Sequence, residues 1–227
     1  MALLAAAAIA QQVPSGHAPS PAIVYRPGAD IRPPIVLTKP KPEYTQEARL
    51  AKLEGSVLLS LVVAKDGRAR EIHVERLLGL GLDEEAVENV RAWKLQPGTK
   101  DDNPVDVRIN GEVFFRLPRQ LWDWHLVSAY FEPLAGASRP VVVKARYPPA
   151  TDPEENALVR ISFEVDADGS PRNVRVETSS APKWETEIVT AFGEGWRFQA
   201  GVKDGKTVAV QGRFDFVRGS HSPIPLR

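Results

Sequence analysis

The chain has 227 residues, and its 29 basic and 29 acidic side chains leave no net charge at pH 7. Its length allows one large domain or two small ones. Its neutrality gives no electrostatic reason to expect nucleic acid or an anionic membrane as a partner. The absence of cysteine excludes disulfides and thiolate metal sites. We therefore expect no nucleic-acid partner, and contact with a membrane only through other proteins.

Residues 1–10 contain a short apolar run that ends in the small-x-small pattern Ala8-Ile9-Ala10. The run has the length of the hydrophobic part of a signal peptide and is too short to span a bilayer, so we expect export. The basic residues that usually precede such a run are missing, which leaves a truncated N-terminus or an Ala-rich tail without export as alternatives. Residues 11–42 are rich in proline and predict a semi-rigid linker, in which residues 35–38 are a candidate short strand.

Residues 43–118 carry the pattern of a small folded unit, which we call the first unit. Helical spacing begins at Tyr44 and stops at Gly55. Alternating apolar residues on both sides of Asp66-Gly67 predict a β-hairpin, because glycine adopts the positive φ that a tight turn needs. A second helix is expected over residues 82–95 and a long final strand over residues 105–117.

The final strand of the first unit alternates over its whole length. Its odd positions are apolar apart from Gly111, and its even positions are polar apart from Phe114. This pattern is typical of a strand with one buried face. Gly111 is a candidate bend or bulge. Phe114 interrupts the polar face and is either an exposed contact for a partner or a residue packed under a neighbouring segment.

Residues 145–218 repeat this order of elements and form the second unit. The hairpin phrase "VVAKDGRAREIHVE" has a near copy in "EVDADGSPRNVRVE", and "WKLQPGTKDDNPVDV" is matched by "WRFQAGVKDGKTVAV". Three prolines in "YPPATDPEEN" predict that the first helix of this copy is short or distorted. The predicted fold is α+β: two tandem α-β-β-α-β units, each a three-stranded antiparallel sheet with both helices on one face.

The connector between the units, residues 119–144, is rich in large apolar side chains and is too apolar for a flexible linker. We interpret it as a short helix that docks between the units. Residues 219–227 form a tail.

The ordered set of motifs strongly resembles the C-terminal domain of TonB energy-transducer proteins. The matching elements are Pro42-x-Tyr44, Gly55-x-Val57, Asp66-Gly67, the helix end "WKLQP" and the alternating final strand. The second unit is similar to a diverged member of the same family. The resemblance implies a periplasmic protein of a Gram-negative bacterium that captures an extended segment of an outer-membrane transporter by adding it as a strand to the sheet edge.

The resemblance also implies where such a segment binds, because in the family the final strand is the binding edge. The corresponding residues are Pro104, Val105, Asp106, Val107, Arg108, Ile109 and Asn110 in the first unit, and Thr207, Val208, Ala209, Val210 and Gln211 in the second unit.

Several functional alternatives stay open at this point. The chain is expected to be a soluble periplasmic binding module; a membrane-anchored transducer whose anchor is missing here, or a structural or assembly protein of the envelope, are the alternatives. The partner is then a transporter segment or a like domain, and the two final strands could instead pair with each other as an intrachain pseudo-dimer, or with a second copy in a homodimer. Scattered histidines and the lack of a nucleophile motif predict no enzyme activity, and no cofactor or metal is expected.

Overall fold

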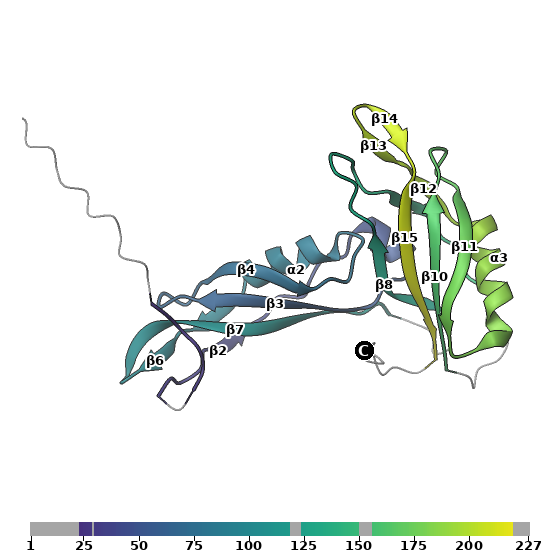
Figure 1. The fold of residues 1–227 in the computed structure, drawn as a ribbon. Helices are drawn as coiled ribbons and strands as arrows, with labels where there is room; N and C mark the ends of the chain where they lie inside the picture. Colours follow the sequence, from purple (N-terminus) through teal and green to yellow (C-terminus); the bar gives the residue numbers. More distant parts are fainter. Residues whose placement is uncertain (1–22, 29, 119–123, 150–155, 220–227) are drawn as a thin grey trace, which may run out of the picture.

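The computed structural model describes residues 23–28, 30–118, 124–149 and 156–219. Figure 1 shows two sheets joined end to end, with the first unit lying flat and the second standing upright beside it. The apolar run of residues 1–10, residues 11–22 of the Pro-rich segment and the tail after residue 219 lie outside the described residues.

The sheet of the first unit contains five strands. Their order is β1 (Val24–Tyr25), β7 (Asn103–Phe115), β3 (Gly55–Val63) and β4 (Ala69–Arg76), and β6 (Gly98–Lys100) pairs with the beginning of β7. The central pairs β7–β3 and β3–β4 are antiparallel, whereas β1 lies parallel to β7. The sheet is thus wider than the three-stranded one that the sequence predicts, because β1 and β6 also pair with β7.

Helix α2 (Leu82–Arg91) covers one face of this sheet and buries Leu82, Ala86 and Val90. Helix α1 (Gln46–Leu50) is short and begins at Thr45, whose hydroxyl accepts a hydrogen bond from the Ala48 N–H at 3.0 Å. Instead of lying beside α2, α1 packs against β9 (Val141–Lys144) of the connector. The strand expected at residues 35–38 is confirmed as β2 (Ile35–Thr38), which pairs with β5 (Lys94–Gln96).

The sheet of the second unit contains four strands in the order β11 (Pro171–Ser179), β10 (Ala157–Val165), β15 (Val210–Arg218) and β8 (His125–Phe131). All three pairs are antiparallel. The 3₁₀ turn η1 (Pro182–Trp184) leads into α3 (Glu185–Gly195), which covers the outer face in Figure 1. Two small antiparallel pairs complete the unit: β9 (Val141–Lys144) with β12 (Arg197–Gln199), and β13 (Gly201–Lys203) with β14 (Lys206–Val208).

The connector differs from its prediction. Its described residues, 124–144, form strands β8 and β9 and contain no helix. The intrachain pseudo-dimer is also wrong, because β7 and β15 are not partners: β15 lies between β10 and β8, and β7 pairs with β3, β1 and β6. Of the three prolines of the second unit, Pro148 and Pro149 are described and lie outside any helix, whereas Pro153 lies outside the described residues.

The two Asp-Gly turns form as predicted, and both require glycine. Gly67 and Gly169 have φ values of 76° and 80°. A Cβ atom would lie 2.4 Å from the Leu95 carbonyl oxygen at Gly67, and 1.9 Å from the Phe198 carbonyl oxygen at Gly169. Each turn therefore sits directly on the strand that follows the second helix of its unit, which only a residue without a side chain permits.

Strand β8 joins the two units. One side of it pairs with β15, and its other side donates the Leu126 N–H to the Lys52 carbonyl at 3.2 Å and the Ala129 N–H to the Leu78 carbonyl at 3.1 Å. The buried apolar side chains of both units, including Leu126, Ala129 and Phe131 of β8, belong to one continuous cluster. The connector is therefore part of the core of both units.

A buried carboxylate strengthens this junction. Glu47 of α1 is 7% exposed, accepts a hydrogen bond from the Val142 N–H of β9 at 2.8 Å, and forms an ion pair with Arg139 at 2.8 Å.

A tyrosine hydroxyl also links the two units. The hydroxyl of Tyr147 donates a hydrogen bond to the Ala51 carbonyl. Burial raises the pKa of Tyr147 well above its ordinary value, so the hydroxyl stays protonated and keeps this bond.

Candidate functional site

The final strand of the first unit has an edge that is only partly covered. On the side opposite β3, β1 lies along Asp106 and Val107. Residues 103–105 pair with β6. Among the described residues, no strand pairs with Arg108–Phe115 on the side opposite β3. Of the residues that the sequence points to, Pro104, Val105, Asp106 and Val107 are thus paired within the chain, whereas Arg108, Ile109 and Asn110 lie on the open edge.

The corresponding edge of the second unit is occupied. Thr207 and Val208 pair with β13, and Ala209 links β14 to β15. Val210 and Gln211 begin β15, and the Gln211 carbonyl accepts a hydrogen bond from the Glu132 N–H at 2.9 Å. From Gly212 onward β8 covers the strand up to Val217. This edge is closed by the chain itself.

The open edge is regular, whereas the opposite edge of the same sheet is not. The β3–β7 ladder runs from Gly55↔Phe115 to Val63↔Val107 without a register shift. The β3–β4 ladder has two shifts, and Glu71 of β4 has a φ of 45°. Bulges and charged side chains are the usual means by which proteins block an exposed edge from pairing. The stretch Arg108–Phe115 therefore lacks the irregularities that disfavour pairing at β4.

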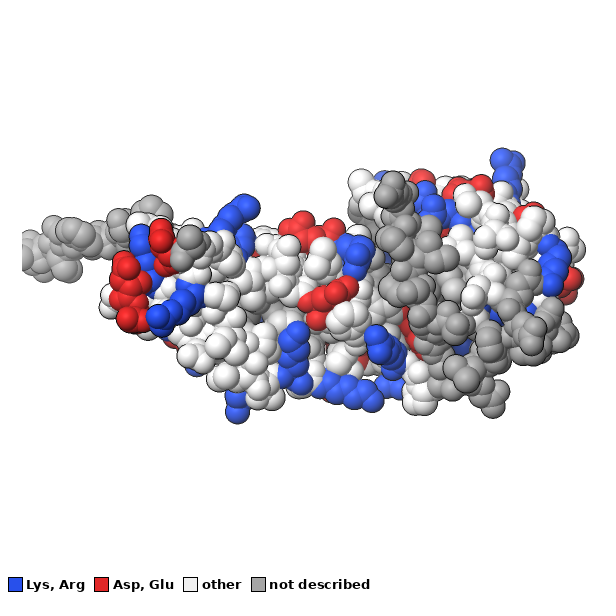
Figure 2. All heavy atoms as spheres, turned by 90° about the horizontal axis from the view of Figure 1, so that it is seen from below, with Lys and Arg blue, Asp and Glu red and all other residues white. Residues whose placement is uncertain are grey.

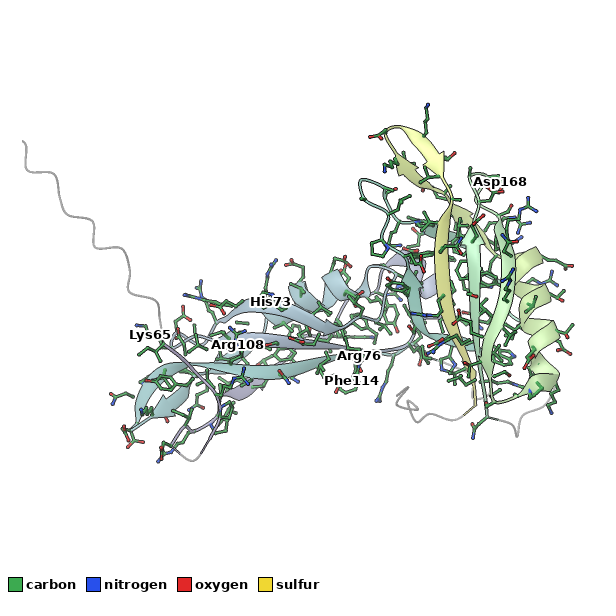
Figure 3. The ribbon with its side chains drawn as sticks, in the orientation of Figure 1. Lys65, His73, Arg76, Arg108, Phe114 and Asp168 are labelled. Carbon is green, nitrogen blue, oxygen red and sulfur yellow. The ribbon has the colours of Figure 1, made fainter. Side chains whose placement is uncertain are left out.

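The side chains of this stretch divide between the two faces of the sheet as the alternation predicts. Val113 and Phe115 are buried beneath the helix-covered face, where Gly111 leaves room for the Trp93 ring. The other face carries Arg108, Asn110, Glu112 and Phe114; Figure 3 labels Arg108 and Phe114. Most charges on this face are paired within the sheet.

Two ion pairs fix the polar face. Arg108 pairs with Glu71 of β4. Glu112 pairs with Arg76 at 2.8 Å and also accepts a hydrogen bond from the Ser56 hydroxyl. These groups are therefore held across β7, β3 and β4 by partners within the same sheet.

A small groove lies at the end of the open edge, next to the second unit. We call it the Phe114 groove; it has a volume of about 260 Å³ and is lined by Lys41, Pro42, Tyr44, Phe114 and Arg116. The Phe114 side chain is 52% exposed, and the Arg116 guanidinium lies 5.6 Å from its ring centre. Figure 2, seen from the side of β7, shows Lys and Arg groups on the first unit near its junction with the second.

The sequence singled out Phe114 as a candidate contact and missed the groove around it. Lys41 and Pro42 belong to the Pro-rich segment, far from Phe114 in the sequence, and no local pattern links them. The alternation predicts a strand that includes residues 111–115, but the resemblance does not place these residues on the binding edge, which they continue in the structure. The Pro-x-Tyr motif at residues 42–44 is the one signal in the sequence that could have pointed to this place.

A larger cavity of about 620 Å³ lies at the junction, between the loop before α2, strand β8 and the segment 132–139. Its wall includes the ion pair between Arg160 and Asp215, joined at 2.6 Å. It also includes Asp83, whose pKa is raised by burial although the N–H groups of Leu78 and Gly79 donate to its carboxylate. Within the described residues no cluster of His, Cys, Asp and Glu is suited to hold a metal ion, and no helix is long and apolar enough to cross a membrane.

Comparison with known proteins identifies the family. The profile described as "Gram-negative bacterial TonB protein C-terminal" matches residues 40–117 and 143–217, which together make up more than half of the chain. Protein TonB of Vibrio cholerae serotype O1 is 30% identical over 110 residues, which cover 47% of this chain and 44% of that protein. The chain thus spans less than half the length of this relative. With two matched segments in tandem, the chain belongs to the TonB C-terminal family.

Proposed function

We propose that the first unit binds an extended segment of an outer-membrane transporter in the periplasm, by adding it as a strand to β7 along Arg108–Phe115. The observation that carries this proposal is the regular edge of β7, which has no partner strand among the described residues over this stretch. An unpaired edge offers a row of N–H and C=O groups, so that a disordered peptide docks through main-chain hydrogen bonds. Membership of the TonB family supports a role in outer-membrane transport.

The second unit offers an internal example of this mode of binding. Its final strand β15 corresponds to β7, and β8 lies antiparallel along the same side, from Gly212 to Val217. Matching the two final strands by sequence aligns this stretch with residues 109–114 of β7. The fold therefore tolerates an added strand on that side without rearrangement of the sheet, which supports the same mode of binding at β7.

We further propose that the second unit supports the first unit and does not itself bind a peptide. Its edge is filled by β8, and displacing β8 would also break the hydrogen bonds from Leu126 and Ala129 to the first unit. An edge that is paired within the chain, which the sequence left open as an alternative, is thus proposed for the second unit only. The chain would accordingly bind one strand.

The experiment uses the absence of native cysteine, which makes an introduced cysteine unique. Asn110→Cys, on the exposed face of the open edge, carries a thiol-reactive photo-crosslinker in the full chain, which is expressed in the periplasm of a Gram-negative cell. We expect covalent adducts with the N-terminal periplasmic segment of an outer-membrane transporter, identified by mass spectrometry.

Gln211→Cys is the matched control, because Gln211 is also exposed and lies at the closed edge of β15. Adducts with transporter segments from Asn110→Cys and none from Gln211→Cys support the proposal. The same yield from both positions, or no transporter adduct from Asn110→Cys, contradicts it.

A further inference from the structure

We propose that strand β2 (Ile35–Thr38) is a separate protein-binding surface, and that it takes a short helix of a partner protein that presents a glutamate next to a small apolar residue. The surface lies away from the open edge of β7, so the inference does not depend on the proposed function. All four residues of β2 are exposed, and three of them, Ile35, Val36 and Leu37, are large and apolar. An apolar strand with an uncovered edge is a usual site of contact with another chain.

Strand β2 is held in place although its side chains are exposed. It pairs with β5 on one side, and among the described residues no strand pairs with its other side. Before the strand, Arg32 and Thr99 exchange two backbone hydrogen bonds, at 2.9 and 3.1 Å. After it, the Asn89 side chain donates to the Pro40 carbonyl at 2.9 Å. A partner therefore meets a preformed apolar surface.

The second unit contains a counterpart of this strand, which is β9. Ile35 of β2 pairs with Gln96, and Val141 of β9 pairs with Gln199. The two glutamines hold the same place in the repeated phrases "WKLQP" and "WRFQA". The two strands therefore correspond residue by residue, and the second unit shows what fits on the outer side of such a strand.

At β9 that outer side is covered by a helix. Val142, the counterpart of Val36, is 2% exposed, whereas Val36 is 36% exposed. Helix α1 of the first unit packs against β9, and its Glu47 carboxylate accepts a hydrogen bond from the Val142 N–H at 2.8 Å. The next residue of the helix, Ala48, is fully buried. One helical turn with a glutamate followed by a small apolar residue therefore closes this kind of surface.

Strand β2 offers the same groups to a partner. By the common register, the Val36 N–H points away from β5, as the Val142 N–H points away from β12. Residues 31–42 contain three basic side chains and no acidic one, and the Lys39 ammonium group is held 4.3 Å from the centre of the Trp93 ring. A glutamate of the partner thus meets a backbone donor and positive charge.

The occupant has to come from a different protein. Helix α1 of a second copy is not available, because its Glu47 and Ala48 are buried in the junction of its own chain. The surface at β2 also differs from β9 in one respect: no basic side chain stands at Pro33, which corresponds to Arg139, the ion-pair partner of Glu47. The carboxylate at β2 therefore depends mainly on the Val36 N–H.

The test uses the full chain labelled with ¹⁵N and a synthetic peptide that copies residues 44–53. A hydrocarbon link between the positions of Gln46 and Leu50, which are both exposed on α1, keeps the peptide helical, since so short a helix is not stable alone. A second peptide carries Glu47→Ala, and a third lacks the link. Chemical shifts of the backbone amides locate the binding site, and their titration gives the dissociation constants.

We expect the linked peptide to shift the amide signals of residues 35–37 up to saturation. The Glu47→Ala peptide should bind about fivefold more weakly, because the Val36 N–H loses its charged acceptor. The unlinked peptide should also bind more weakly, because it has to form its helix on binding. Val36→Glu in the chain should abolish binding. Val202→Glu is the matched control, since Val202 lies on another short strand and is 38% exposed, and it should leave binding unchanged.

The outcomes separate this inference from the proposed function. Unchanged signals at residues 35–37, or shifts confined to β9, where the peptide would displace α1, overturn the inference. Equal affinity of the Glu47→Ala peptide overturns the role of the carboxylate, and tighter binding of the unlinked peptide overturns the helix as occupant. Transporter adducts through Asn110→Cys should be the same with and without Val36→Glu. The peptide comparisons use the unaltered chain and stay decisive if Val36→Glu lowers its stability.

Discussion

Replacing Phe131 tests whether the connector is a working part of the second unit. The Phe131 side chain is 9% exposed and meets the rings of Phe163, Phe198 and Phe214 edge-on, at centroid distances of 6.2, 6.0 and 5.5 Å. Burying a phenylalanine side chain contributes about 1.5–3 kcal/mol, and the cavity left by Phe→Ala raises the total cost to about 3–5 kcal/mol. Since this side chain lines the open cavity at the junction, we expect the lower end, about 3 kcal/mol.

The assay is urea unfolding of the full chain, followed by tryptophan fluorescence and repeated as a thermal scan. A loss of about 3 kcal/mol in a chain of this size lowers the melting temperature by about 6–12 °C. Phe131→Leu keeps most of the apolar volume and should lose about 1 kcal/mol. Phe114→Ala, at an exposed phenylalanine, should stay within about 0.5 kcal/mol of the wild type. A loss below about 1 kcal/mol for Phe131→Ala would refute the placement of β8 in the core.

Three further predictions concern the junction and the turns. Glu47→Ala should lower the unfolding free energy by about 2 kcal/mol, because Arg139 and the Val142 N–H of β9 lose a charged acceptor. Urea unfolding measures this loss. A change near zero would show that water replaces the carboxylate. Tyr147→Phe should cost about 1 kcal/mol at pH 7, where the hydroxyl bond is intact. Because burial raises the folded-state pKa of Tyr147, the stability tied to its proton is complete below the unfolded pKa of about 10 and is lost as the pH rises above it. Unfolding midpoints between pH 7 and 11 should therefore fall less steeply for Tyr147→Phe than for the wild type, and parallel curves would contradict this. Gly169→Ala should lower the melting temperature clearly, since a Cβ would lie 1.9 Å from the Phe198 carbonyl oxygen, and an unchanged melting temperature would disprove that close approach.

The strands and turns that periodicity specifies were predictable. Each final strand alternates between a buried and an exposed face, and each Asp-Gly pair marks a turn in which glycine has a positive φ. These patterns identify faces, because side chains alternate perpendicular to the sheet. They contain no information on edges, because edge pairing is decided by backbone groups that every residue carries. The family resemblance points to Pro104–Asn110 as the edge, and the stretch that is open in the fold, Arg108–Phe115, had to come from the structure.

Strand β8 escaped prediction for a local physical reason. Its pairing with β15 has a register shift between Asp215 and Phe216, so that one residue of β8 has no partner and its period-two pattern is interrupted. The large apolar groups around it then favoured a helix in the interpretation of the sequence. Strand β1 has two residues, too few for any period to show. The Phe114 groove depends on such contacts between distant segments and could not be derived from either segment alone.

Because β8 belongs to the core of both units, the residues that make up one sequence repeat differ from the residues that one folded unit needs. A fragment that starts at residue 145 would contain every element of the repeat, but its β15 would be bare from Gly212 to Val217 and its aromatic cluster would be open beside Phe214. A fragment that ends at residue 118 would lose the strand that accepts the Glu54 N–H. We therefore expect each half, cut at the limits of the repeat, to be less stable than the same half within the full chain.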